Sequence, residues 1–336
     1  MSSSNELERM RILLCELQNH LRKIICTARD ADTAQALAGV AEVTPADTIY
    51  EIDKISESAI VAWFAEHWPA ELPVELIMEG AEAHGAITIP KGTPIGETAW
   101  KCILDPIDGT RNMMYDKRAA WALAGIAPQR GGKNTLQDIA VAAMTALPTS
   151  REWRSDQLSA IRGEGLFCTA CDMRDGTSGP IEFHPSKASD CQHGFASVVR
   201  FFPDGLGLLG ELEERLWKKL YPDAPGGSPL VFNDQYITTG GQLYELIAGH
   251  DRFIADLRPL VFKKLGLDGS LSTHPYDLAA ALVAEEAGIV LVDPVSGKAL
   301  NAPLDTTTPV AWVAFANEAI AAHIGPVLNK LIQEML

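Results

Sequence analysis

The sequence lacks any run of apolar residues long enough to cross a membrane, where a helix needs about 20 in succession. Its N-terminus also lacks the basic start and apolar core of a secretory signal peptide. Positive charge is scarce, because 28 Lys and Arg stand against 44 Asp and Glu, for a formal net charge of −16. Such a chain repels phosphate backbones and anionic lipids. We therefore expect a cytoplasmic protein with neither a nucleic-acid polymer nor a membrane as partner.

Cysteine is sparse as well, with six residues in the chain. Cys168 and Cys171 form a CxxC pair, but the sequence has no second pair and no histidine at the matching distance of a zinc site. Several of the cysteines lie in apolar runs, where buried reduced thiols are common. The spacing therefore favours structural thiols over a metal or redox centre.

The 336 residues are enough for a large core and two domains. Up to about residue 190, two predicted helices are followed by successive strands, as in an antiparallel or mixed sheet. From residue 191 onward, strands and helices alternate, which is typical of α/β layering. We therefore divide the chain into 1–190, an N-terminal α+β domain, and 191–336, a C-terminal α/β domain.

Apolar periodicity predicts the elements of both domains. Helices are expected within 5–40, 51–68, 240–249, 276–288 and 318–336. Strands are expected at 74–78, 98–105, 119–127, 138–147, 158–168 (broken at its glycines), 194–202, 251–257, 289–294 and 309–317. The first helix is expected to bury Met10, Leu13, Leu17, Leu21 and Ile24, and the second to bury Ile52, Ile55, Ala59 and Trp63.

Two aspartates stand three residues apart in the stretch ILDPIDGTRN, where the strand predicted at 98–105 ends. We expect Asp105 and Asp108 to face the same point across a short turn. Gly109 lets the backbone approach a ligand closely, and the N–H groups at Gly109 and Thr110 would point at an anion. Carboxylate oxygens suit Mg²⁺, and Mg²⁺ suits phosphates. The Ile107 carbonyl is a further candidate ligand. An ordinary Asp-Pro turn explains the same letters, so the rest of the chain must decide.

Acidic residues at three more places in the chain fit such a site. Glu79 directly follows the strand predicted at 74–78, and Asp277 opens the helix predicted at 276–288. Asp53 and Glu57 share one face of the second helix. Each has a simpler explanation: a solvated loop acid for Glu79, a helix N-cap for Asp277 and a solvated helix face for Asp53.

In order along the chain, the stretches EIDKISE, LIMEG, WKCILDPIDGTRN, AIRGEGLFC and HPYDLAAALVAEEAGIVLVDP resemble the inositol monophosphatase family. This is a superfamily of Mg²⁺-dependent, lithium-sensitive phosphatases that includes fructose-1,6-bisphosphatases. The resemblance runs from about residue 50 to the C-terminus. It implies a layered α+β / α/β sandwich with alternating α-β-α-β-α layers and the site between its two halves. It also implies a phosphoric monoester hydrolase, and homodimers are common in the family.

The resemblance implies a set of metal ligands for two or three Mg²⁺ per active site. Glu79, Asp105 and the Ile107 carbonyl would hold one Mg²⁺, and Asp105, Asp108 and Asp277 would hold a second. The family often has two acids where Glu79 is followed here by Gly80, which bears on a third metal position.

The resemblance also implies catalytic and substrate-binding residues. Asp53, Glu79 and Thr110 would position and activate the attacking water. Gly109 and Thr110 would bind the phosphate through backbone N–H groups, and Asp256 would contact hydroxyl groups of the substrate. The expected activity is hydrolysis of a small phosphorylated polyol, sugar or nucleotide.

Several departures from the family leave the substrate open. Arg111 follows Thr110 in place of a small polar residue, Tyr276 replaces the usual Trp, and the segment 257–276 is longer than in the simplest members. Inositol phosphate, a sugar bisphosphate such as fructose bisphosphate, a 3′-phosphonucleotide and histidinol phosphate are all candidates. The alternatives from other classes are a non-catalytic protein that binds metal and phosphate ligands on the same fold, and an acidic scaffold.

Overall fold

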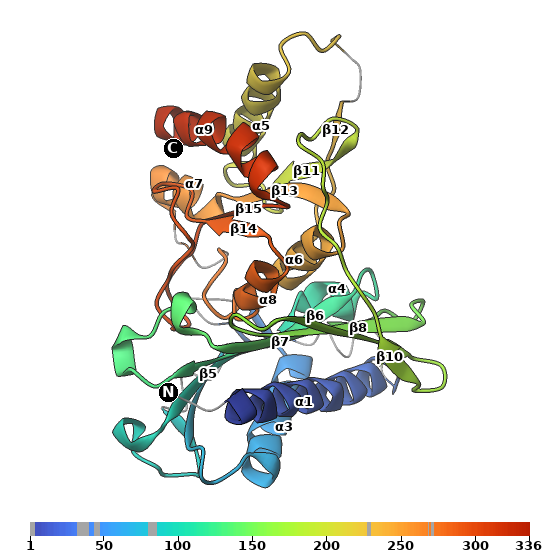
Figure 1. Cartoon of the computed structure of the whole chain (residues 1–336), viewed down its shortest axis with the longest axis vertical. Helices are drawn as coiled ribbons and strands as arrows, with labels where there is room; N and C mark the ends of the chain where they lie inside the picture. The colour runs from blue at the N-terminus through green and yellow to red at the C-terminus, as the bar shows by residue number, and fades with distance from the viewer. Residues whose placement is uncertain are drawn as a thin grey trace.

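Two β-sheets divide the chain into halves in the computed structural model (Figure 1). The structure describes residues 4–31, 40–43, 48–79, 86–226, 230–267, 269 and 272–336, leaving aside the side chains of 40–43 and 48–53. The larger sheet contains β3 (Val74–Met78), β4 (Ile87–Ile89), β5 (Trp100–Asp108), β6 (Ala120–Pro128), β7 (Val141–Leu147), β8 (Arg154–Ile161), β9 (Gly165–Asp172) and β10 (Ser178–Pro180). The smaller sheet contains β11 (Gly194–Val198), β12 (Val231–Phe232), β13 (Asp251–Asp256), β14 (Val290–Val292) and β15 (Trp312–Phe315). A separate antiparallel pair is formed by β1 (Val40–Val43) and β2 (Thr48–Tyr50).

Both sheets are mixed. The larger has the order β10-β9-β8-β7-β6-β5-β3-β4, in which β3 and β5 are parallel and the other neighbours antiparallel. The smaller has the order β12-β11-β13-β15-β14, with β11 parallel to both of its neighbours. Every strand of the larger sheet precedes residue 181 and every strand of the smaller one follows residue 193.

The helices complete five layers. They are α1 (Ser4–Ala31), α3 (Glu51–His67), α4 (Thr110–Met114), α5 (Leu206–Leu220), α6 (Thr239–Ile247), α7 (Arg258–Leu265), α8 (Ala281–Glu286) and α9 (Glu318–Met335), with short 3-10 turns η2 (Ile95–Glu97), η3 (Gly131–Lys133) and η4 (Leu136–Asp138). Figure 1 shows α1 and α3 on the outer face of the larger sheet, α6 and α8 between the sheets, and α5 and α9 beyond the smaller sheet. The expected α-β-α-β-α layering is therefore present. None of the helices in the described part of the chain has the length and apolar character of a membrane span.

Strand β6 shows why the central strands read as continuous apolar runs. Successive side chains on a strand point to opposite faces. Ala122 and Ala124 belong to the core under α1 and α3, whereas Trp121 and Leu123 belong to the core between the sheets. Both faces are covered by helices, so neither needs polar residues.

The two N-terminal helices bury somewhat different faces from those predicted. The buried apolar stripe of α1 consists of Met10, Leu14, Leu17, Leu21, Ile25 and Cys26. Leu13 and Ile24 lie at its edges and are partly buried. In α3, Ile60, Trp63 and Phe64 are buried, but Ile55 is 44% exposed, so its predicted place in the core was wrong. The Ile52 side chain lies outside the described residues.

Three other predictions differ from the structure. The segment 158–168 forms a hairpin, because β8 ends at Ile161 and β9 begins at Gly165. The segment 276–288 forms turns followed by the short helix α8, with the N–H of Asp277 donating to the His274 carbonyl at 3.1 Å. Helices α5 and α7 were not predicted, although Leu209, Leu212 and Leu216 give α5 a helical repeat.

The CxxC pair lies on β9, and both thiols are free. Residues three apart on a regular strand point to opposite faces. Cys168 packs against the core between the sheets, where its pairing partner Leu158 also lies. Cys171 pairs with Ser155, whose hydroxyl accepts a hydrogen bond from Arg22 of α1 on the outer face. The two thiols therefore cannot serve one ion.

Strand β6 passes close beneath the turns at 275–280. A Cβ at Gly125 would lie 2.5 Å from the Ala279 carbonyl oxygen and 2.9 Å from Cδ1 of Ile139. Even one methyl group would push the two halves apart at this point. We expect Gly125→Ala to lower the free energy of unfolding by about 1–3 kcal/mol, the usual cost of overpacking.

The matched control is Gly179→Ala in β10, where a Cβ would meet nothing within 4 Å. Denaturant unfolding of both variants measures the difference. Equal losses at the two positions would contradict the close packing at Gly125.

Candidate metal centre

A bulge in β5 turns Asp105 and Asp108 toward the same side of the sheet. Asp105 pairs with Leu123 and Asp108 pairs with Trp121, so three steps along β5 match two along β6. An extra residue of this kind is a β-bulge, and it re-aims the side chains beside it. We expected the strand to end at Asp105, but β5 continues to Asp108 because the bulge accommodates Pro106, which cannot donate to the ladder.

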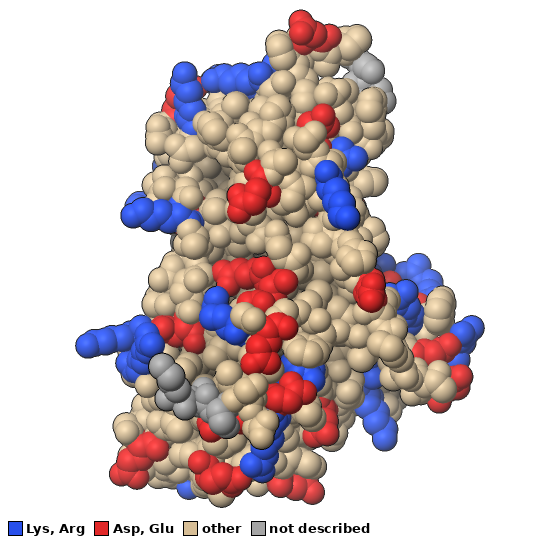
Figure 2. All heavy atoms as spheres, viewed as in Figure 1, with Lys and Arg blue, Asp and Glu red and all other residues tan. Residues whose placement is uncertain are grey.

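Asp277 brings a third carboxylate to these two. One oxygen from each of Asp105, Asp108 and Asp277 can be chosen so that all lie within 4.8 Å of one another. Asp105 is 2% exposed and Asp108 is 5% exposed, while Asp277 is partly exposed. Figure 2 shows acidic side chains gathered near the middle of one face, where the two halves meet.

The turn before α8 holds Asp277 in place. Asp277 Oδ2 accepts a hydrogen bond from the backbone N–H of His274 at 2.6 Å. The N-cap of α8 is Ala280, so the simpler explanation of Asp277 as a helix cap is wrong. Its carboxylate belongs to the preceding turn, which faces β5.

Glu79 adds a fourth acid at the border of the cluster. It is the first residue after β3, as predicted, and its Oε1 accepts a hydrogen bond from the Tyr276 hydroxyl at 3.5 Å. Its charge is one cause of the raised pKa of Asp105. The acid after β3 therefore lies within electrostatic reach of the acids on β5.

Burial raises the pKa of two of these carboxyl groups, those of Asp105 and Asp108. Burial raises the pKa of Asp105 well above its usual value, and the charges of Glu79, Asp108 and Asp277 raise it further. Burial raises the pKa of Asp108 to about 7, although the N–H groups of Gly240 and Thr239 act in the opposite direction. Buried like charges of this kind need protons or cations as partners. Carboxylate oxygens are the ligands that hard divalent cations such as Mg²⁺ prefer, so this donor set fits such an ion.

The segment after β5 leads into α4 beside the acids. Gly109 is the N-cap of α4 with φ of 93°, a conformation that favours glycine. A Cβ there would overlap the methyl group of Thr238, so the close approach of another part of the chain also requires glycine. The Thr110 hydroxyl donates to the Ile107 carbonyl at 3.0 Å. These residues thus lie next to Asp108, as their order in the sequence predicts.

Asp256 and Asp53 are two further predicted site residues. Asp256 is fully buried, and both of its oxygens accept hydrogen bonds from Arg258. Its Oδ2 also accepts a hydrogen bond from Thr273 at 2.7 Å. These partners of Asp256 lie inside the chain, and its contact with substrate hydroxyl groups stays a prediction. Asp53 belongs to α3, but its side chain lies outside the described residues, as does Gly80.

The sequence predicted a helix at 240–249, close to α6 (Thr239–Ile247), but it did not assign the start of that helix to the site. The Gly240 N–H donates to Asp108 Oδ2, and the Thr238 side chain caps the helix by accepting from the Gly241 N–H at 2.6 Å. Threonine is a favoured N-cap residue, and glycine allows close backbone approach. The letters TTGG before an apolar helical pattern therefore indicate a capped helix start that another part of the chain can approach closely.

Comparison with known proteins finds similarity in structure. No protein-family model matches the chain, and no curated protein matches it in sequence. The extragenic suppressor protein SuhB of Bartonella henselae superposes with a TM-score of 0.64 at 17% identity, over 98% of this chain and 100% of that one. Fructose-1,6-bisphosphatase of Leishmania major gives 0.62 at 15%, over 98% and 94%. SuhB of Mycobacterium tuberculosis gives 0.61 at 18%, over 98% of both. At these identities the comparison establishes the fold, which is the one that the resemblance to inositol monophosphatases implies.

The raised carboxyl pKa values predict how stability depends on pH without metal. Between about pH 4 and about pH 7 the folded protein keeps a proton on Asp108 that the unfolded chain releases. Stability should therefore fall as pH rises through this window. Asp108→Asn removes the titrating group, so its stability should fall less. Denaturant unfolding in EDTA, at about pH 5 and about pH 8, measures both slopes.

Asp172→Asn is the control, because the Arg174 side chain lowers the pKa of that partly exposed carboxyl to about 2, below the window. An equal fall in the Asp108→Asn variant and the unaltered protein would contradict the raised pKa of Asp108.

Proposed function

We propose that this chain is a divalent-metal-dependent phosphomonoesterase that acts on a small phosphorylated polyol, sugar or nucleotide. The observation that carries the proposal is the convergence of Asp105, Asp108 and Asp277 within 4.8 Å between the two halves. The fold supports it, because a fructose-1,6-bisphosphatase has the same architecture. A cytoplasmic location and a homodimer belong to the same proposal.

The acidic residues would hold Mg²⁺. We assign one ion to Glu79, Asp105 and the Ile107 carbonyl, and a second to Asp105, Asp108 and Asp277. When bound, such ions neutralise phosphate oxygens and lower the pKa of water toward neutrality. The structure supports the second set most directly, because its three carboxylates face one another.

The remaining residues would orient the reactants. Phosphoryl transfer depends mainly on positioning and on neutralising charge. Gly109 and Thr110 lie at the start of α4, directly after Asp108, and would orient the phosphate with their backbone N–H groups. The Thr110 hydroxyl, already directed at the Ile107 carbonyl, would orient the attacking water with Asp53 and Glu79.

The direct test is phosphate release from a panel of small phosphomonoesters. The panel contains an inositol phosphate, fructose 1,6-bisphosphate, a 3′-phosphonucleotide and histidinol phosphate, each with Mg²⁺, with EDTA and with added Li⁺. We expect Mg²⁺-dependent release that EDTA abolishes and Li⁺ inhibits. Asp108→Asn should reduce the rate by about 100-fold or more, since a metal ion's stabilisation of charge is worth several kcal/mol.

Asp172→Asn, which changes a partly exposed aspartate outside the cluster, should leave the rate unchanged. Mg²⁺ binding without release from any ester would favour a non-catalytic binding protein on the same fold. Absence of Mg²⁺ binding by calorimetry would contradict the metal centre itself.

A further inference from the structure

The start of α6 approaches Asp108 so closely that a small displacement would separate them. The Gly240 N–H donates to Asp108 Oδ2. A Cβ at Gly240 would lie 2.7 Å from Cδ2 of Leu123 and 3.1 Å from Asp108 Oδ2. The position of this helix therefore sets how one carboxylate of the cluster is oriented. Helix α6 and Asp108 come from different halves of the chain, so something must fix one half against the other here.

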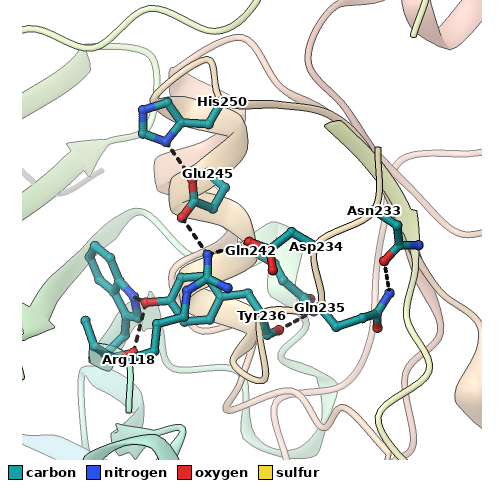
Figure 3. A network of polar contacts seen from close by, with 10 residues as sticks. Arg118, Asn233, Asp234, Gln235, Tyr236, Gln242, Glu245 and His250 are labelled. Atoms are coloured by element: carbon teal, nitrogen blue, oxygen red, sulfur yellow. Dashed lines mark hydrogen bonds and ion pairs between the residues drawn. The ribbon is translucent and has the colours of Figure 1, made fainter. Parts of the chain in front are cut away.

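Arg118 connects the two halves at this point. It precedes β6 in the larger sheet, and its guanidinium reaches the segment 234–245 of the other half (Figure 3). Arg118 Nη2 donates to Asp234 Oδ2 at 2.8 Å and to Glu245 Oε1 at 3.3 Å. Asp234 comes before the start of α6 and Glu245 lies within the helix, so one side chain contacts the segment on both sides of Gly240.

Tyr236 strengthens the same connection. The guanidinium of Arg118 lies 3.8 Å from the centre of the Tyr236 ring. The Tyr236 hydroxyl donates to the Ala119 carbonyl at 2.9 Å and accepts from Nε1 of Trp121 at 3.2 Å. Trp121 in turn pairs with Asp108 across β5 and β6. Arg118 and the metal centre are thus joined by a short series of contacts.

The α6 side of the network is also packed tightly. Nε2 of Gln242 donates to the Tyr236 carbonyl at 2.8 Å, and a Cβ at Gly241 would lie 2.5 Å from Cζ of Tyr236. His250 contacts the second oxygen of Glu245 at 2.5 Å, which leaves the first oxygen directed at Arg118 (Figure 3). The helix therefore has little freedom to move while Arg118 holds its flanks.

We propose that Arg118 is a positioning residue, which holds the segment 234–245 so that the N–H groups of Thr239 and Gly240 bind Asp108. The assignment rests on the proposed function only in treating Asp108 as a metal ligand. A planar guanidinium suits this task, because it can stack on a ring and donate to two carboxylates together. Lysine offers a point charge and cannot do both.

The test compares Arg118→Met with Arg174→Met. Arg174 makes the same kinds of contact, an ion pair with Asp172 and a guanidinium 4.8 Å from the centre of the Trp153 ring. Its side chain is 69% exposed, however, and these contacts do not involve α6. Hydrogen exchange on the metal-free protein measures protection of the Thr239 and Gly240 amides. Calorimetry measures Mg²⁺ affinity.

Arg118→Met should speed exchange at Thr239 and Gly240 and weaken Mg²⁺ binding by roughly 10-fold to 100-fold, as for other groups that orient metal ligands. Exchange along β7 (Val141–Leu147) should stay unchanged, which shows that the fold is intact. Arg174→Met should alter neither quantity. Arg118→Lys should have exchange rates and a Mg²⁺ affinity between those of the unaltered protein and Arg118→Met. If Arg118→Met does not fold, the lysine variant decides the claim.

Unchanged exchange at Thr239 and Gly240 in the Arg118 variants would overturn the proposal. Faster exchange with unaltered Mg²⁺ affinity would overturn its link to the metal centre. Failure of the unaltered protein to bind Mg²⁺ would refute the proposed function instead, and the exchange measurement would still decide whether Arg118 positions α6.

Discussion

Repulsion among three carboxylates is the constraint on which this structure depends. Asp105, Asp108 and Asp277 are held close together, two of them almost fully buried. Each accepts a hydrogen bond from a backbone N–H: that of Ile107 for Asp105, that of Gly240 for Asp108 and that of His274 for Asp277. Backbone donors cannot rotate away as side chains can. The carboxylates are therefore fixed in an arrangement that is unfavourable without protons or cations, which is the condition expected of a preorganised metal centre.

The layered architecture supplies those three donors from three places. The bulge in β5 provides the Ile107 N–H and turns both aspartates toward the layer between the sheets. Helix α6 and the turn before α8 lie in that layer and carry the other two donors (Figure 1). Close packing of glycines permits the approach, as at Gly125 beneath Ala279 and at Gly240 beside Leu123. A change in how the halves pack would therefore displace the backbone donors from these carboxylates.

Local features of this arrangement could be predicted from the sequence, and long-range ones could not. The stretch VELIM predicts β3 with the bounds that the structure has, and Glu79 follows it toward the acids. The DPIDGT stretch and Asp277 were recognised as one set through their resemblance to a family. The bulge at Pro106 was missed because periodicity reports where strands run and not how they register. The Gly240 contact with Asp108 joins residues 132 apart in the chain, so no local pattern could reveal it. The pair of Asp256 with Arg258 is local in the sequence, but its burial depends on how the whole chain packs.

The central claim is that the carboxylates of the two halves together bind divalent cations. Crystals of the protein soaked in Mn²⁺, with anomalous scattering recorded at the manganese edge, test this most directly, because manganese shares the oxygen ligands of Mg²⁺. We predict an anomalous peak between Asp105, Asp108 and Asp277, at about 2.0–2.2 Å from their oxygens, as in octahedral oxygen sites. Saturating Mn²⁺ with no peak between these three side chains would contradict the account.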